Sequence, residues 1–154
     1  MNSMRGYVSA LFWAIAVAMF VTGAHAAEAT KPHRIAFHID QGDPAVMNLV
    51  LNNVTNVTDY YNGKGEEVQI EVVAYGPGLN MLRDDKSPVK DRIKQIAEKS
   101  FPSKVSFAAC GNTMTGMEKN EGHPISLITQ ATVVPAGVVR LNELQEQGWS
   151  YIRP

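Results

Sequence analysis

The chain contains one cysteine, Cys110, and the residues around it favour a reactive sulfur atom. An apolar run at residues 105–109 precedes it and is typical of a buried strand, whereas Gly111, Asn112 and Thr113 are typical of a turn into a helix. A thiol at the end of a strand and the start of a helix can be held as the thiolate, which is the nucleophilic form. The pattern predicts a nucleophile or sulfur carrier, with the backbone N–H groups of Gly111, Asn112 and Thr113 as a small anion-binding nest.

Three interpretations of Cys110 remain open at this stage. The thiol could be inert in the core, because free cysteines are among the most buried residues. It could be reactive and kept reduced by another component, or it could bridge two chains, because a single cysteine cannot form a disulfide within one chain. Asn112 and Thr113 could also serve only as caps of the following helix.

Two further loops carry candidate ligand-binding residues. Asp40, Gly42 and Asp43 follow the first predicted strand, and Gly76 and Gly78 flank a proline after the second. The two carboxylates could orient a substrate or accept a proton, although an Asp beside Gly and Pro is also a common helix cap. The two glycines could cradle an anion or provide the geometry of a sharp turn.

We predict no metal site and no cofactor. His38 lies in the first predicted strand and His123 lies in a loop beside a proline, and neither has a partner at the spacing of metal ligands. The glycines at 76 and 78 lack both the Walker lysine and the dinucleotide-binding spacing. Methionines 114 and 117, close to the cysteine, are interpreted as packing residues.

Strand-like and helix-like segments alternate along the chain. Strands are expected at residues 34–40, 68–74, 105–110, 132–134 and 149–152. Helices are expected at 44–62, 79–82, 89–99, 114–117, 124–130 and 138–145, with an exposed turn at 119–122. Crossover helices between strands predict a three-layer α/β/α sandwich with a mainly parallel five-stranded sheet. The loops at 40–43, 76–78, 110–113 and 135–137 all follow strands, so we expect them on one edge of that sheet.

The first 26 residues resemble a cleavable secretory signal. Arg5 precedes an apolar stretch at residues 8–21, and Ala24-His25-Ala26 has the pattern of a cleavage site. An uncleaved anchor is less favoured, because this stretch is shorter than the ~18–20 residues that span a bilayer. We therefore expect a single domain at residues 27–154 that is periplasmic or secreted, without stable membrane insertion after signal cleavage.

The charge of the chain argues against nucleic acid as a partner. Lysine and arginine number 14 against 15 aspartates and glutamates, which gives a formal net charge of −1. No basic run is present that could follow a phosphate backbone.

Several segments together resemble the DsrE/DsrF-like family. They are residues 38–44, 51–54, 73–79, 107–114, 135–138 and 144–151, and each is a weak motif that gains specificity from the order of the set. The resemblance implies a parallel α/β/α domain that forms trimers or hexamers, and in some members a cysteine that carries persulfide sulfur between proteins. Cys110 is the residue here that would take this role. Export is a departure from the family, whose sulfur relays operate mainly in the cytoplasm, and the subgroup that this chain resembles is largely uncharacterised.

Two functional hypotheses follow. In the first, the protein handles sulfur in the periplasm as a persulfide carrier or sulfurtransferase-like protein, with Cys110 receiving sulfur from a donor protein and passing it to an acceptor. In the second, the domain is a noncatalytic oligomeric module, which takes one of two forms. Either the same edge of the sheet or a pocket between subunits binds a small ligand, or the protein is an oligomeric interaction module with Cys110 buried at the subunit contact.

Overall fold

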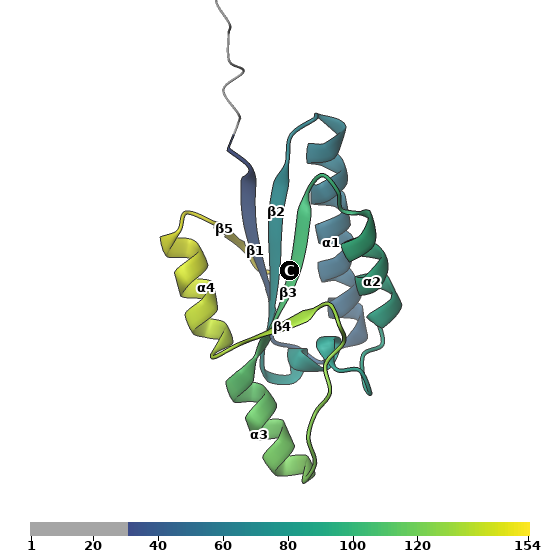
Figure 1. Cartoon of the computed structure of the whole chain (residues 1–154), viewed down its shortest axis with the longest axis vertical. Helices are drawn as coiled ribbons and strands as arrows, with labels where there is room; N and C mark the ends of the chain where they lie inside the picture. The colour runs from purple at the N-terminus through teal and green to yellow at the C-terminus, as the bar shows by residue number, and fades with distance from the viewer. Residues whose placement is uncertain (1–30) are drawn as a thin grey trace, which may run out of the picture.

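A computed structural model describes residues 31–154, in which five strands alternate with helices (Figure 1). The predicted signal segment at residues 1–26 lies outside the described residues. The elements in chain order are β1 (His33–Ile39), α1 (Pro44–Gly63), β2 (Val68–Ala74), the 3₁₀ helix η1 (Gly76–Leu82), α2 (Lys90–Lys99), β3 (Lys104–Cys110), α3 (Gly111–Glu121), β4 (Ala131–Val134), α4 (Gly137–Glu146) and β5 (Ser150–Ile152). No helix within residues 31–154 combines the length and the apolar character needed to cross a membrane.

The sheet has the order β4-β3-β2-β1-β5, and all four pairs of neighbouring strands are parallel. The pairing register aligns Phe37 with Val72, and Val72 with Phe107, so these three side chains point to the same face. The fold predicted from the alternating segments is confirmed. Because every strand runs in the same direction, the loops that follow the strands must meet at one edge.

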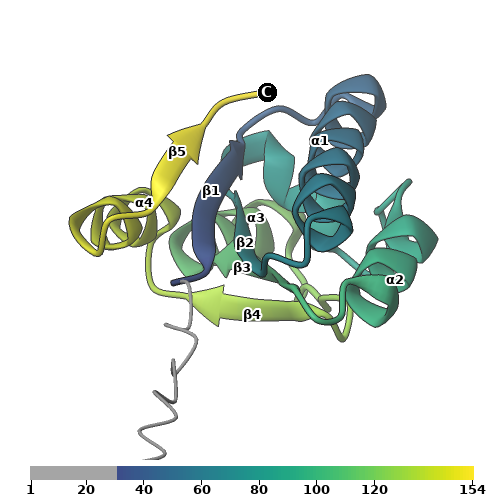
Figure 2. The ribbon, with the colours of Figure 1, turned by 90° about the horizontal axis from the view of Figure 1, so that it is seen from above.

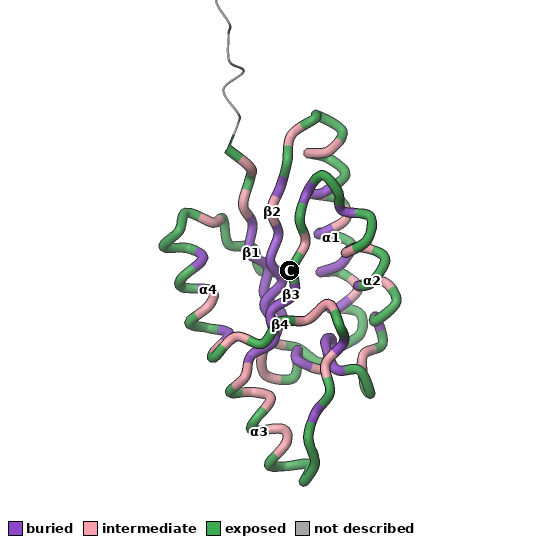
Figure 3. Tube along the Cα trace, in the orientation of Figure 1, coloured by how far each residue is buried: buried purple, intermediate pink, exposed green. Residues whose placement is uncertain are grey.

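The two faces of the sheet are covered unequally. On one face, α1, α2 and η1 pack on the larger apolar side chains of the strands, and most of the core lies here (Figures 2 and 3). On the opposite face α4 packs on small residues, Leu141 and Leu144 of the helix contacting the layer that contains Ala36, Val73 and Ala108. The third layer is therefore a single helix that lies close to the backbone of the sheet.

An ion pair ties α4 to the sheet. Glu71 of β2 is buried, and its two carboxylate oxygens each accept a hydrogen bond of 2.7 Å from the guanidinium of Arg140 in α4. A bidentate pair fixes both the distance and the orientation of the groups that it joins. It therefore sets how the first turns of α4 lie over the ends of the strands.

Three segments differ from the sequence-based expectations. The segment with Gly76 and Gly78 was expected as a sharp turn before a short helix at 79–82, but the helix already begins at Gly76 and is the 3₁₀ helix Gly76–Leu82. The segment 119–121, expected as a turn, continues α3, which ends at Gly122 in the left-handed conformation (φ 75°). The helix expected at 124–130 is absent, because this backbone pairs with the end of η1: the Ile128 N–H donates to Leu82 and the Asp84 N–H donates to Ser126.

Gly78 allows η1 to lie directly on the end of β1. A Cβ atom built at this residue would lie 2.3 Å from the carbonyl oxygen of Ile39, closer than real Cβ contacts. This oxygen belongs to the backbone of a strand, which cannot move aside in the way that the tip of a flexible side chain can. The glycine is therefore required by the packing of η1 against β1.

Replacing Gly78 by alanine is expected to lower the free energy of unfolding by about 1–3 kcal/mol, as for overpacked cores. Gly116→Ala is the matched control, because Gly116 lies in α3 with no atom within 4 Å of an added Cβ. In a helix interior that change is expected to stabilise by roughly 0.5–1 kcal/mol. Urea unfolding followed by circular dichroism measures both variants, and equal stability of the two would contradict the packing role of Gly78.

Candidate functional site

Cys110 is the last residue of β3 and the N-cap of α3. This is the position predicted from its neighbours in the sequence. The side chain lies on the face of the sheet that α4 covers, because it alternates with Ala109, which belongs to the core beneath α1 and α2. Only 5% of Cys110 is exposed in the single chain.

The four loops expected at one edge are joined there by direct contacts. The Gly76 N–H donates to the Thr113 hydroxyl oxygen at 3.0 Å, and the Asn112 N–H donates to the Pro135 carbonyl at 3.2 Å. A Cβ atom built at Gly42 would lie 3.4 Å from Pro77, which places the first loop against the second. The prediction that these loops meet at one edge of the sheet is confirmed.

Hydrogen-bond donors surround the sulfur of Cys110. The Thr113 N–H donates to Sγ over 3.5 Å. Burial raises the pKa of Cys110, but hydrogen bonds from the Thr113 hydroxyl and from the backbone N–H groups of Gly137, Thr113 and Asn112 oppose it and leave this pKa below its usual value. The balance favours the thiolate, which is the reactive form of cysteine.

The sulfur lies between the N-terminal ends of two helices. Cys110 caps α3, and Gly137, whose N–H faces the sulfur, is the first residue of α4. Helix N-termini carry partial positive charge and favour an anion. A Cβ atom at Gly137 would lie 3.3 Å from the Cβ of Cys110 and 3.1 Å from that of Tyr75, so glycine lets α4 begin this close to the thiol.

The anion-binding nest differs in its members from the one expected from the sequence. The Thr113 N–H donates to the sulfur as expected. The Asn112 N–H donates instead to the Pro135 carbonyl and is the smallest of the influences that lower the pKa of Cys110. Gly111 has a packing role, because a Cβ there would lie 3.1 Å from the carbonyl of Val134. Gly137, which follows the fourth strand, supplies the donor that the local pattern around Cys110 did not indicate.

The remaining predicted site residues divide into two groups. Asp43 is the N-cap of α1, its carboxylate accepting a hydrogen bond of 2.8 Å from the Ala45 N–H. Gly76 adopts a left-handed backbone conformation (φ 52°), and Gly42 and Gly78 give room for close contacts between loops. Only Asp40 joins a cluster of polar side chains at this edge.

Two members of that cluster, Tyr75 and Tyr151, were not singled out from the sequence, and His38 was considered there and rejected as a metal ligand. His38, Tyr75 and Tyr151 lie on the same face as Cys110, and their rings contact one another: the His38 centroid is 5.5 Å from that of Tyr75 and 5.4 Å from that of Tyr151. The alternation of His38 with Phe37 and Ile39 indicated its face. Its two tyrosine neighbours became visible only with the strand order, because Tyr151 belongs to an edge strand that is far away in the sequence.

A separate groove lies between α1 and α2 on the other side of the sheet. It has a volume of about 340 Å³ and includes Thr58, Asp59, Arg92 and Lys99 in its lining. No residue of the four loops around Cys110 contributes to it. Within residues 31–154, no group of three or more His, Cys, Asp or Glu side chains is placed to hold a metal ion.

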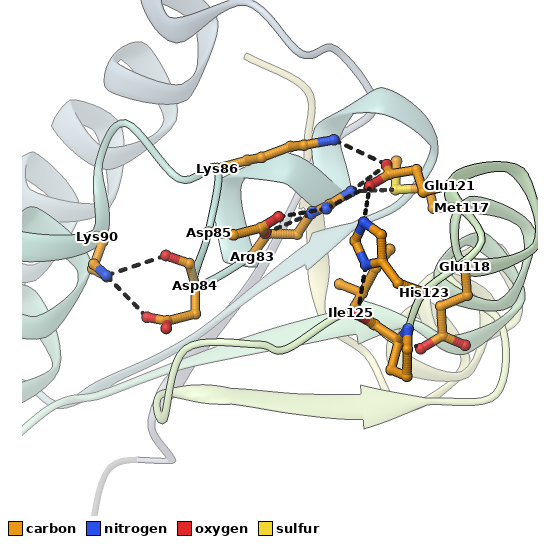
Figure 4. A network of polar contacts seen from close by, with 11 residues as sticks. Arg83, Asp84, Asp85, Lys86, Lys90, Met117, Glu118, Glu121, His123 and Ile125 are labelled. Carbon is orange, nitrogen blue, oxygen red and sulfur yellow. Dashed lines mark hydrogen bonds and ion pairs between the residues drawn. The ribbon is translucent and has the colours of Figure 1, made fainter.

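The far end of α3 is held by a buried arginine (Figure 4). The Arg83 side chain has no exposed surface and donates paired hydrogen bonds to Glu121 of α3, at 2.6 and 2.8 Å, and to Asp85, at 2.9 and 2.7 Å. Lys86 adds a hydrogen bond of 3.0 Å to Glu121. None of the residues of α3 is buried, so this clamp contributes much of what holds the helix that begins at Cys110.

Hydrogen bonds from Arg83 and Lys86, with a further contribution from their charges, lower the pKa of Glu121 from 4.5 to about 2. A carboxylate whose pKa is lower in the folded state than in the unfolded state stabilises the fold at pH values above its pKa in the unfolded state. This contribution is lost as the pH falls toward its pKa in the folded state. We expect the stability of the wild-type protein to fall between about pH 5 and pH 2, and Glu121→Gln to be less stable at pH 7 with a shallower dependence in that range. Urea unfolding at several pH values measures this effect. Glu98→Gln in α2, an exposed glutamate with no ion pair in the described chain, serves as the control.

Removing the Thr113 hydroxyl is expected to raise the pKa of Cys110. In Thr113→Val the thiolate loses one donor and the Gly76 N–H loses its acceptor, which costs about 1–3 kcal/mol of stability. Thr113→Ser keeps both interactions. The rate of alkylation of the folded protein is measured against pH, and the midpoint of this curve is the apparent pKa of Cys110. The midpoint should rise for Thr113→Val. It should stay unchanged for the control Thr115→Val, which removes an exposed hydroxyl from the same helix. An unchanged midpoint in Thr113→Val would show that the hydroxyl does not act on the sulfur.

The chain is similar to known proteins in fold and sequence. A model of the DsrE/DsrF-like family matches residues 17–154. Among solved structures, the chain is similar to a protein of unknown function, MTH1491, from Methanobacterium thermoautotrophicum, with 35% sequence identity and a TM-score of 0.66 over 79% of this chain and 99% of that chain. No curated protein matches the chain. The chain therefore belongs to the DsrE/DsrF-like family, which is associated with sulfur relay.

Proposed function

We propose that the protein carries sulfane sulfur as a persulfide on Cys110. The observation that supports this function is the environment of the thiol. Cys110 lies between two helix N-termini and accepts a hydrogen bond from the Thr113 N–H, and although burial raises its pKa, the polar groups of Thr113, Gly137 and Asn112 lower it overall. A carrier must stabilise a negative charge on its sulfur before loading and on the outer sulfur after loading. Donors from two loops and two helices are suited to both states.

The transfer needs no cofactor. In loading, the Cys110 thiolate attacks the outer sulfur of a donor persulfide, the S–S bond of the donor breaks, and the donor thiolate leaves with the electron pair and takes up a proton. In unloading, an acceptor thiol loses its proton, attacks the outer sulfur on Cys110, and the Cys110 thiolate leaves. No net oxidation occurs in either direction, because one S–S bond forms as another breaks. The hydrogen bonds to Cys110 make it a better leaving group in the second step.

The proposal includes export to the periplasm or secretion, and it includes self-association. Export rests on the signal-like pattern at residues 1–26, and a thiol in an oxidising compartment must be kept reduced by a partner. Self-association is supported by three exposed valines, Val133, Val138 and Val139, in and after β4, the strand that pairs with the end of β3. A donor or acceptor must also approach near this surface, because Gly137 covers the sulfur.

The burial of Cys110 favours a second candidate function. With 5% of the residue exposed, the thiol can also be a structural part of a noncatalytic module that binds a ligand or partner at the same edge. A structural thiol resists alkylation in the native protein and reacts quickly after unfolding. A carrier reacts in the folded state, with a rate that follows its lowered pKa.

Exposure to a sulfane donor is expected to add about 32 Da, one sulfur atom, to each wild-type chain, because the thiolate accepts the outer sulfur. Mass spectrometry of the intact protein measures the gain, and a reductant should reverse it. Cys110→Ser is expected to gain nothing. Failure of the folded wild-type protein to load, with native alkylation equally absent, would reject the carrier and support the module.

A further inference from the structure

The groove between α1 and α2 lies on the face of the sheet opposite to Cys110, so it takes no part in the chemistry of the thiol (Figure 2). Its volume of about 340 Å³ is enough for a small organic molecule. Its two walls are stripes of side chains at helical spacing, with Thr55 and Asp59 on α1 facing Arg92, Ile96 and Lys99 on α2. The groove has the size of a ligand site, and the charges along it decide which ligand fits.

Arg92 is held in this groove by neutral oxygen atoms. Its Nη1 donates to the side-chain oxygen of Asn48 at 2.5 Å, and its Nη2 donates to that of Asn52 at 2.8 Å. Among residues 31–154, Arg83 and Arg140 are each paired with a carboxylate, whereas Arg92 has no carboxylate partner. The amide oxygens therefore fix the position of the Arg92 side chain and leave its positive charge without a counter-charge.

One edge of the Arg92 guanidinium has donors left for a ligand. In Arg83 the Nε and Nη2 atoms donate to the two oxygens of Asp85, and in Arg140 the same two atoms donate to the two oxygens of Glu71. In Arg92 the Nε has no acceptor within the described residues, and Nη2 uses one of its two N–H groups. A carboxylate fits such an edge, because its two oxygens match the paired N–H groups of a guanidinium.

The position of Arg92 along α2 adds to its attraction for an anion. It is the third residue of this helix, and the first turn of a helix carries partial positive charge. Asp91 in the same turn is exposed and does not line the groove. The lining contains two cationic side chains, Arg92 and Lys99, against the single carboxylate of Asp59, so the groove is positively charged.

The α1 wall of the groove offers hydrogen-bond acceptors. The hydroxyls of Thr55 and Thr58 each donate their proton to a carbonyl one turn earlier in the helix, both at 2.9 Å. A hydroxyl oxygen whose proton is used in this way can still accept a hydrogen bond. A ligand that carries a hydrogen-bond donor beyond its carboxylate therefore finds a partner on this wall.

We propose that the groove binds a small organic acid that carries a hydrogen-bond donor at its other end. The carboxylate accepts hydrogen bonds from Nε and Nη2 of Arg92. The carbon atoms lie against Ile96, one turn further along α2, and a hydroxyl or amino group of the ligand donates to Thr55 on the facing wall. Binding is noncovalent and does not involve Cys110, so this site goes beyond the proposed carrier function.

Titration of the protein with butyrate, butyramide and 4-hydroxybutyrate, followed by the NMR shifts of backbone amides, tests the site. Butyrate is expected to shift the amides of residues 55–59 and 92–99 and to leave those of Gly111 and Gly137 unchanged. Butyramide has nearly the same shape but no charge, and it should bind at least about tenfold more weakly, because charge-assisted hydrogen bonds are the stronger ones. 4-Hydroxybutyrate should bind more tightly than butyrate, and Thr55→Val should remove this advantage.

Variants of α2 separate the edge of the guanidinium from its charge. Arg92→Lys keeps the charge but loses the paired donors, and it is expected to weaken butyrate binding by about tenfold or more. Lys94→Gln removes an exposed cation of α2 outside the groove lining and should bind as the wild-type protein does. Circular dichroism shows whether each variant is folded, and the comparison of butyrate with butyramide needs no substitution.

Three results would overturn the site: no shifts in the groove with butyrate, equal affinity for butyrate and butyramide, or unchanged binding in Arg92→Lys. Cys110→Ser is expected to bind butyrate as the wild-type protein does, because the thiol lies on the opposite face of the sheet. The groove and the sulfur carrier are therefore tested separately, and failure of one leaves the other standing.

Discussion

The Thr113 hydroxyl links the geometry of two loops to the chemistry of the thiol. Its oxygen accepts the hydrogen bond of the Gly76 N–H, and this leaves its own proton for the sulfur of Cys110. A hydroxyl can accept and donate at the same oxygen, whereas a backbone N–H can only donate. The turn after β2 and the start of α3 are thereby held in one arrangement with the sulfur. The loop after β4 joins it through the contact of Asn112 with Pro135.

The helix that starts at this site depends on a polar anchor at its opposite end. Because α3 has no buried residue, the hydrophobic effect contributes little to its position beyond the contacts of Met114 and Met117 with the core. Arg83 compensates by pairing with Glu121 through both carboxylate oxygens. The two ends of α3 are thus held by different interactions: polar contacts around the sulfur of Cys110 at the first turn, and the paired hydrogen bonds between Arg83 and Glu121 at the last.

The sequence allowed the layers of the fold and the position of the cysteine to be predicted, because both follow from local periodicity. The alternation in β2 and the helical period in α1 each correspond to an element of the structure. The segment 124–130 could not be predicted in this way, because its conformation depends on pairing with Leu82 and Asp84, about forty residues earlier. Gly137 was expected at this edge as part of the loop 135–137, but its role beside the sulfur was not. Tyr151 could not be placed near His38, because this requires the strand order.

The state of the thiol is decided by a competition between burial and hydrogen bonding. Desolvation is the largest single influence on Cys110 and acts against the thiolate, yet several donors together outweigh it. Each of these hydrogen bonds is stronger in a buried setting than it would be in water. Burial therefore disfavours the charged thiolate by removing water, and at the same time strengthens the hydrogen bonds that stabilise it. On the proposed carrier function, the same burial would protect a persulfide on Cys110 from solvent. A reagent or partner therefore reaches the sulfur only if the structure opens there, and the first turn of α4 is the nearest element that could move. A Cβ atom added at Gly137 would lie 3.3 Å from that of Cys110 and 3.1 Å from that of Tyr75, so any larger residue there would crowd the thiol further.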